Sequence, residues 1–181
     1  PSAVQRMLDF DYVNGRDKPS IAAVIEPRKL KSSMDKFFWG SEPILVPIIN
    51  DIDKGLKQFN EVKHIISFSS FRSAYESTMT LLDYEQIISI TVIAEGIPER
   101  YARVFNEKAR KLKKLIIGPA TVGGIKPGCL RIGNTGGSLS STEYTVPMRN
   151  SDGMYLDADD NEFYLIIRYK GNPSPVTSIT I

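Results

Sequence analysis

Residues 87–118 read IISITVIAEGIPERYARVFNEKARKLKKLIIG, and they predict a strand, a turn, a helix and a second strand in that order. The run Ile87–Ala94 is short and rich in β-branched residues, which is typical of a strand buried on both faces of a parallel sheet. Apolar residues then recur every three or four positions, as on one face of a helix. They are Ala102, Phe105, Ala109 and Leu112. We expect Pro98 to be the first helical residue, and Leu115–Ile117 to form the next strand.

The same alternation extends over residues 1–139. Three further strands are predicted, at Ile21–Ile25, Ile44–Ile49 and Ile65–Phe68. Two further helical stripes are predicted, one at Ile49, Ile52, Leu56 and Phe59, the other at Phe71, Tyr75, Thr78 or Met79, and Leu82. Alternating strands and helices predict an α/β fold with helices on both faces of a mostly parallel sheet.

Residues 118–137 and the tail differ from this pattern. The stretch GPATVGGIKPGCLRIGNTGG contains many glycines, and we expect a turn-rich loop with a short strand at Cys129–Ile132. In the tail, Phe163–Tyr169 and Val176–Ile181 are predicted to be two strands joined by a turn.

Composition restricts the class of protein. The 181 residues fit one domain, or one domain with an appendage. The net charge of +2 gives no reason to expect nucleic-acid binding. No apolar run approaches the ~18 residues that cross a bilayer, and no signal-peptide pattern begins the chain. We therefore expect a soluble cytoplasmic protein without a membrane partner.

Ligands of parallel α/β sheets gather beyond the carboxyl ends of the strands, so the residues there are candidates. After the first strand, Pro27 stiffens a turn and Lys29 offers a cation to a phosphate, although an ordinary solvated turn is the preferred interpretation. After Ile65–Phe68, hydroxyls can cap a helix, and the same N–H groups can hold an anion beside Arg72. Glu95 can accept a ligand hydrogen bond or simply begin a helix.

Other reactive residues favour structural roles. His64 is the only histidine, so neither a histidine pair for a metal nor a Ser-His-Asp triad can be built. Cys129 has no evident activating base, and a small semi-buried residue is preferred. The acidic cluster at 157–162 lacks the spacing of a calcium loop. We expect no metal site and no catalytic residue.

Four segments resemble a known family. They are AVQRMLDFDYV (3–13), SFRSAYESTM (70–79), IAEGIPE (93–99) and IGPATVGGIKPGCLRIGNTGG (117–137). They resemble the coenzyme-A-binding segment of ATP-citrate lyase, and more loosely the succinyl-CoA synthetase alpha subunit. The resemblance implies a Rossmann-like domain over residues 1–139 that holds coenzyme A at its strand tips. Carried over by position, the implied contacts are Pro27, Lys29, Ser69, Ser70, Phe71, Ile93, Ala94, Glu95, Pro119, Ala120 and Thr121.

The resemblance also implies departures from the family. The family domain begins with a strand and a glycine-containing turn, and this chain starts after both. Residues 140–181 do not match the domain that follows and that carries a phosphorylated histidine. One hypothesis is that Phe163–Tyr169 takes the position of the first strand, which would otherwise leave neighbouring strands unpaired.

The leading hypothesis is a coenzyme-A-binding segment of an enzyme that converts citrate, ATP and coenzyme A to acetyl-CoA, oxaloacetate, ADP and phosphate. By itself the segment would be catalytically incomplete. ATP and Mg²⁺ would act only in the complete enzyme, whose other domains or subunits would be partners. The alternatives are a subunit completed by partner chains, and a non-catalytic interaction or structural module with a broken coenzyme A site.

Overall fold

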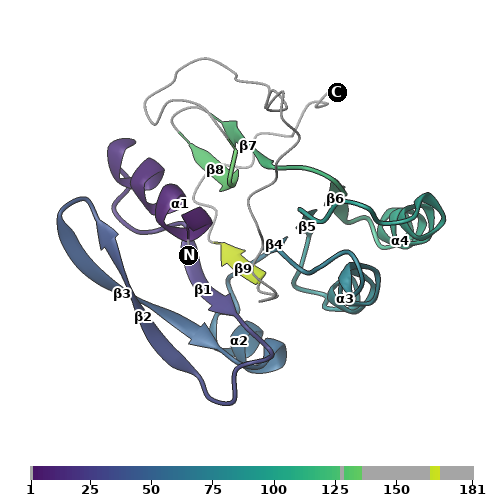
Figure 1. Cartoon of the computed structure of the whole chain (residues 1–181), viewed down its shortest axis with the longest axis horizontal. Coiled ribbons are helices and arrows are strands. Elements are labelled where there is room, and N and C mark those ends of the chain that lie inside the picture. The colour runs from purple at the N-terminus through teal and green to yellow at the C-terminus, as the bar shows by residue number, and fades with distance from the viewer. Residues whose placement is uncertain (1, 127–128, 136–163, 168–181) are drawn as a thin grey trace.

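The computed structural model describes residues 2–126, 129–135 and 164–167, which form two sheets with helices around them (Figure 1). From one edge to the other, the main sheet contains β2 (Ser33–Trp39), β3 (Glu42–Ile49), β1 (Ile21–Ile25), β9 (Tyr164–Ile167), β4 (His64–Ser67), β5 (Ser89–Val92) and β6 (Leu115–Ile117). β3, β1, β4, β5 and β6 run in one direction, and β2 and β9 run against them. The prediction of a mostly parallel α/β sheet is confirmed.

The predicted strands are present, with shifted ends. The apolar run at Ile87–Ala94 contributes only Ser89–Val92 to β5, because its first two residues precede the strand and its last two already belong to the loop beyond it. β3 begins two residues earlier than expected, at Glu42. β4 begins at His64 and ends at Ser67, so Phe68 lies outside it. β1 and β6 have the expected bounds.

The three predicted helices are α2 (Ile52–Gln58), α3 (Ala74–Leu81) and α4 (Glu99–Lys111). The Asp51 side chain accepts the Lys54 N–H at 2.7 Å and caps α2. The expectation for Pro98 is wrong by one residue: Pro98 is the N-cap of α4, with an extended ψ of 135°, and Glu99 is the first helical residue. Phe105 and Ala109 form the buried stripe of α4.

Two apolar clusters cover the two faces of the main sheet. In Figure 1, α2, α3 and α4 lie on one side of it, whereas α1 (Ser2–Val13) and a small hairpin lie on the other. The first cluster joins Ile25 and Ile65 to helix residues such as Leu56 and Phe105. The second joins Val24, Ile48 and Ile66 to Met7 and Leu8 of α1. The central strands β1, β4 and β5 are therefore buried on both faces, as their continuous apolar runs predicted.

The β2–β3 hairpin was not predicted from the sequence. It turns at Gly40, whose φ of +62° lies in the left-handed region. A β-carbon at Gly40 would approach the Tyr12 ring to 2.4 Å, and this ring also meets Trp39 edge to face at 5.9 Å. The end of α1 therefore packs onto the hairpin turn.

The edge strand β2 is partly capped by one side chain of α1. The Gln5 amide donates to the Phe38 carbonyl at 2.9 Å, and its oxygen accepts the Phe38 N–H at 3.0 Å. Gln5 thus pairs with Phe38 as a neighbouring strand would.

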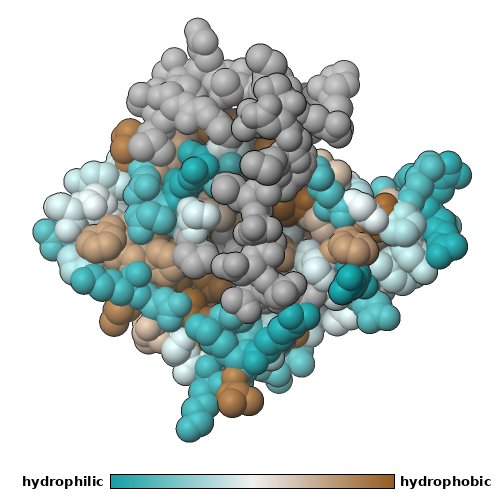
Figure 2. Space-filling model, in the orientation of Figure 1, coloured by the Kyte–Doolittle hydropathy of each residue, from teal (hydrophilic) through white to brown (hydrophobic). Residues whose placement is uncertain are grey.

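The outward face of the hairpin carries exposed apolar side chains. Brown atoms are visible over this region in Figure 2. Met34, Phe38 and Leu45 are about half exposed or more. The register pairs Met34 with Pro47 and Lys36 with Leu45, so these residues share one face. α2 packs near Ile49, at the carboxyl end of β3, and covers only that end of the hairpin.

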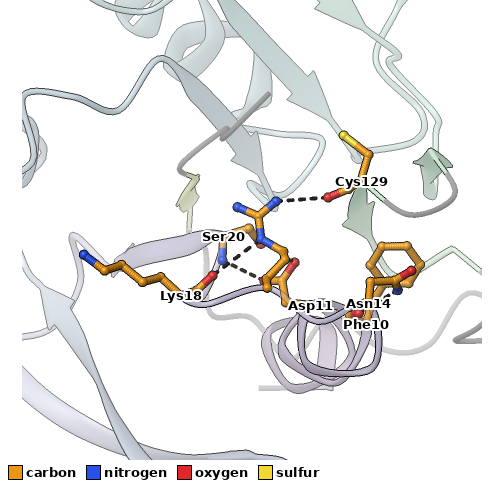
Figure 3. Close-up of polar contacts among 7 residues, drawn as sticks. Phe10, Asp11, Asn14, Lys18, Ser20 and Cys129 are labelled. Carbon is orange, nitrogen blue, oxygen red and sulfur yellow. Dashed lines mark hydrogen bonds and ion pairs between the residues drawn. The ribbon is translucent and has the colours of Figure 1, made fainter. Parts of the chain in front are cut away.

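A buried acidic residue joins the end of α1 to β1 (Figure 3). Asp11 is 0% exposed, accepts the Ser20 N–H at 2.7 Å, and lies 3.5 Å from Arg16 Nε. Burial raises the pKa of Asp11, and the Ser20 hydrogen bonds and the Arg16 charge oppose that rise in part. Arg16 also donates to the Cys129 carbonyl at 3.0 Å. This arrangement connects α1, β1 and the segment before β8.

The glycine-rich stretch is more ordered than the expected loop. It forms an antiparallel pair, β7 (Gly123–Lys126) and β8 (Leu130–Gly133). A β-carbon at Gly123 would lie 1.8 Å from the Ile132 carbonyl oxygen, so only glycine permits this pairing. The expected strand at Cys129–Ile132 is correct apart from its ends, and the expectation of a single strand was wrong.

The tail contributes β9 to the centre of the main sheet. β9 lies between β1 and β4 and pairs antiparallel with both. Tyr164–Ile167 of the predicted strand Phe163–Tyr169 therefore enters the sheet, and the hypothesis that this stretch takes the position of the family's first strand stays a prediction. The predicted strand at Val176–Ile181, the turn before it and the acidic cluster at 157–162 lie outside the described residues.

Candidate functional site

The turn between β4 and α3 presents three exposed side chains at the carboxyl edge of the sheet. Ser70, Phe71 and Arg72 follow one another here, and Phe71 is 53% exposed. The Arg72 guanidinium lies 5.4 Å from the centre of the Phe71 ring. Arg72 forms no ion pair within the described part of the chain. A cation and an aromatic ring are therefore available to a ligand at this turn.

Buried serines support this turn from below. Ser69 is 3% exposed, and its Oγ lies 3.1 Å from the Oγ atoms of both Ser67 and Ser77. Ser77 Oγ also donates to the Ser73 carbonyl at 2.6 Å. N-cap Ser73 makes no side-chain cap bond to α3, and its Oγ lies 3.2 Å from Ser70 Oγ. The hydroxyls therefore hold the turn together, and sequence reasoning missed Ser67 and Ser77.

The loop after β5 lies beside the β4–α3 turn. Ile93, Ala94 and Glu95 are half-buried here, and the Ile93 N–H donates to the Ser67 carbonyl at 3.1 Å. A β-carbon at Gly96 would lie 4.0 Å from the Phe71 β-carbon. The two loops are thus in contact range, and Glu95 belongs to the second of them.

The loop after β6 contacts the end of β5 and the loop that follows it. The Ala120 N–H donates to the Ala94 carbonyl at 2.9 Å. At Gly118, φ is +97° and a β-carbon would lie 2.4 Å from the Val92 carbonyl oxygen, so the backbone passes directly against the end of β5. Pro119 and Thr121 are half-buried, and the Thr121 hydroxyl accepts the Gly123 N–H at 3.1 Å.

The loop after β1 lies at the same edge but is set apart. β9 separates β1 from β4, so Pro27 and Lys29 do not adjoin the Ser69–Phe71 turn. Lys29 Nζ lies 3.3 Å from Glu26 and 3.8 Å from Asp35. Pro27 is exposed. The structure therefore brings together nine of the eleven predicted residues and leaves this pair to one side.

A groove of about 360 Å³ lies beside this separate loop, between the β2–β3 hairpin and α2. Met34, Pro47 and Ile48 give it apolar walls, and Lys54 adds one cation. Ser33, which also lines it, has its Oγ 3.5 Å from Lys29 Nζ. The groove was not foreseen from the sequence because the hairpin that forms one wall was not predicted.

His64 lies beside a residue of the neighbouring strand and away from the candidate site. His64 Nδ1 lies 2.7 Å from Ser89 Oγ at the opposite edge of the sheet, and burial together with Lys63 lowers the pKa of His64. Across residues 2–126, 129–135 and 164–167, no three metal-ligating side chains gather. Nor does any helix in those ranges reach the length and apolarity of a membrane span.

The relatives found by comparison with known proteins are ATP-citrate synthases or subunits of them. No protein-family model matches the chain. The chain is 52% identical over 139 residues to ATP-citrate synthase of Bos taurus, and the match covers 77% of this chain and 13% of that protein. It is 49% identical to the probable ATP-citrate synthase subunit 1 of Schizosaccharomyces pombe, again over 77% of this chain and over 22% of that subunit.

Solved structures of ATP citrate lyase are also similar to this chain. ATP citrate lyase from Methanothrix soehngenii, in complex with citrate and coenzyme A, superposes with a TM-score of 0.72 at 48% identity. The match covers 75% of this chain and 22% of that chain. ATP citrate lyase of Methanosaeta concilii in complex with (3S)-citryl-CoA gives 0.72 at 47%, over 76% and 22%. The chain therefore spans a small part, 13–22%, of these four relatives.

Proposed function

We propose that the carboxyl edge of this chain, which is homologous to ATP-citrate synthase over about 77% of its length, binds coenzyme A. One observation carries the proposal. The loops after β4, β5 and β6 meet at one edge, on a fold shared at 48% identity with an ATP citrate lyase in complex with citrate and coenzyme A. Coenzyme A, when bound, supplies a thiol that accepts an acyl group.

The residues present fit such a ligand. The phosphates of coenzyme A need cations or backbone N–H groups, and Arg72 provides an exposed guanidinium at the start of α3. Phe71 provides an exposed aromatic face for an apolar or planar part of the ligand. The Glu95 carboxylate can accept a hydrogen bond from a hydroxyl or amide group.

The backbone of the other two loops would complete the site. Ile93 and Ala94 would line it from the tip of β5, and Pro119, Ala120 and Thr121 from the loop after β6. Ser70 would face the ligand, whereas Ser69 would act from beneath by holding the turn. Pro27 and Lys29 would contact only a ligand long enough to pass the end of β9.

We further propose that the complete enzyme, and not this chain alone, converts citrate, ATP and coenzyme A to acetyl-CoA, oxaloacetate, ADP and phosphate. ATP and Mg²⁺ would be held by other segments, because this chain matches only 13% of the Bos taurus relative. Such an enzyme would supply acetyl-CoA for lipid biosynthesis in the cytoplasm.

Isothermal titration of the full chain with coenzyme A tests the proposal. We expect Arg72→Ala to weaken binding at least about tenfold, because a charge-assisted hydrogen bond is lost. Arg110→Ala, which removes an exposed charge near the far end of α4, serves as the matched control and should bind as the parent chain does. A folded chain that gives no heat with millimolar coenzyme A would refute the proposal.

The alternative is an interaction or structural module with a broken site. One observation favours it: β9 lies between β1 and β4 and keeps the loop at Pro27 and Lys29 apart from the other three. The same titration distinguishes the two functions, since a module of this kind would not bind coenzyme A.

A further inference from the structure

The groove between the β2–β3 hairpin and α2 has apolar walls. Met34 of β2 lines it, together with Pro47, Ile48 and Ile49 of β3. α2 lies against the same strand, since a β-carbon at Gly55 would be 3.7 Å from the Ile49 Cδ1 atom. None of the residues that line the groove belongs to the loops after β4, β5 and β6.

One flank of α2 supplies polar groups to this groove. Lys54 and Gln58 are four residues apart, so their side chains share a flank of the helix, and both residues are exposed. Lys54 forms no ion pair within residues 2–126, 129–135 and 164–167. Ser32 and Ser33 add hydroxyls on the hairpin side. The groove therefore combines apolar walls with one positive charge.

In the part of the chain that the structure describes, no carboxylate lines the groove. The acidic side chains of neighbouring segments have partners of their own. Asp35 lies 3.8 Å from the ammonium group of a lysine in the loop after β1. Asp51 caps α2, and Asp53 forms a hydrogen bond with Tyr84. A ligand in the groove would therefore meet the ammonium group of Lys54, which attracts an anion.

The volume of the groove restricts the size of that anion. The groove measures about 360 Å³. An apolar cavity of about 150 Å³ holds one benzene molecule, so a ligand about twice as large, with roughly 12–14 non-hydrogen atoms, would fit here. An aliphatic chain of this size would bury methylene groups against the apolar walls. A carboxylate at the end of the chain would pair with the lysine.

We propose that this groove binds a medium-chain aliphatic carboxylate, of which decanoate has about the right size. The chain would lie along Met34, Pro47 and Ile49, and the carboxylate would lie at Lys54. The Gln58 amide would donate a further hydrogen bond to the carboxylate. The apolar walls would thus select the chain and the lysine would select the charge. This site does not depend on the proposed binding of coenzyme A.

Titration of the full chain with decanoate, followed by NMR below the concentration at which decanoate forms micelles, tests the proposal. We expect the backbone amides of Ser33, Met34, Lys54 and Gln58 to shift along one binding curve. Hexanoate should bind at least about tenfold more weakly, because each buried methylene tightens binding by up to about fourfold. 1-Decanol, which has the chain without the charge, should bind at least about threefold more weakly.

Two variants of α2 test the role of the charge. Lys54→Met removes the ammonium group from an exposed position and keeps an apolar side chain, so its affinity for decanoate should fall at least about threefold. Lys57→Met is the matched control, because Lys57 is exposed on the same helix and does not line the groove, and it should bind decanoate as the parent chain does. Equal affinity of the parent chain and Lys54→Met would overturn the proposal. So would the absence of shifts at millimolar decanoate.

Coenzyme A separates this proposal from the proposed function. We expect an excess of coenzyme A to leave the affinity for decanoate unchanged, because the groove lies apart from the loops after β4, β5 and β6. Loss of decanoate binding on addition of coenzyme A would place both ligands in one site and overturn the proposal. A chain that binds decanoate and does not bind coenzyme A would contradict the proposed function alone.

Discussion

Replacing Asp11 by alanine is expected to lower the free energy of unfolding by about 3–5 kcal/mol, the range found when one partner of a buried ion pair is removed. The carboxylate is fully buried, accepts the Ser20 N–H at 2.7 Å and lies 3.5 Å from Arg16 Nε. Alanine leaves that N–H without an acceptor, which alone costs about 1–3 kcal/mol. The remainder comes from Arg16, whose side chain is only 13% exposed and would lose its acid.

Asparagine at position 11 separates the hydrogen bond from the charge. Its amide oxygen can still accept the Ser20 N–H, so we expect a smaller loss of about 1–2 kcal/mol.

The raised pKa of Asp11 determines whether the free energy of unfolding rises or falls with pH. Burial raises the pKa of Asp11 above 3.8, so the native state keeps this proton more tightly than the unfolded chain. The resulting stabilisation is complete below the unfolded pKa and is lost as pH rises through the folded pKa.

Urea unfolding followed by circular dichroism at pH 7 measures the loss in each variant, and a pH series from 4 upward measures the difference between the parent chain and Asp11→Asn. That difference should fall with rising pH and then become constant. Glu76→Ala, at an exposed position on α3, is the control and should stay within about 0.5 kcal/mol. A loss below about 1 kcal/mol for Asp11→Ala would mean that this buried contact does not hold α1 to β1.

Three further changes test other parts of the molecule. Phe105→Ala removes a fully buried ring and should cost about 3–5 kcal/mol in urea unfolding; a loss below about 2 would contradict its placement in the core. Gly118→Ala should cost more than about 1 kcal/mol, whereas Gly124→Ala, with nothing near its β-carbon, should cost less; equal losses would argue against the close approach to Val92. Burial and Asp53 raise the pKa of Tyr84 to about 12, so absorbance titration should show one late tyrosine that Tyr84→Phe removes, and stability should fall between pH 10 and 12.

The sequence predicted the strand–helix–strand units because apolar residues recur with clearly different spacings in the strands and in the helices. The stripe at Phe105 and Ala109 repeats at helical spacing, and both residues are buried on α4. The β2–β3 hairpin was missed because Met34 and Phe38 on one face are as apolar as Phe37 and Trp39 on the other. Such a strand has no period-two contrast. The turn at Gly40 was the remaining signal that could have located it.

The sequence predicted which loops form the candidate site, but it did not predict how their side chains are arranged. Parallel strands place their carboxyl ends at one edge, so the loops after β4, β5 and β6 had to be neighbours. Sequence could not decide which of the adjacent serines 69 and 70 is buried, because that depends on how the backbone leaves β4 and on the distant hydroxyl of Ser77. It also could not give the direction of β9, which only pairing with β1 and β4 determines.

The amide pairing of Gln5 with Phe38 has a consequence for how these molecules behave when crowded. An outer strand that offers unpaired backbone groups can nucleate sheet growth and lead to aggregates. On β2, an incoming strand would first have to displace Gln5 from both of its bonds to Phe38 and then pass the positive charge of Lys36. Gln5 of α1 is therefore expected to protect the edge of β2 against pairing with strands of other molecules.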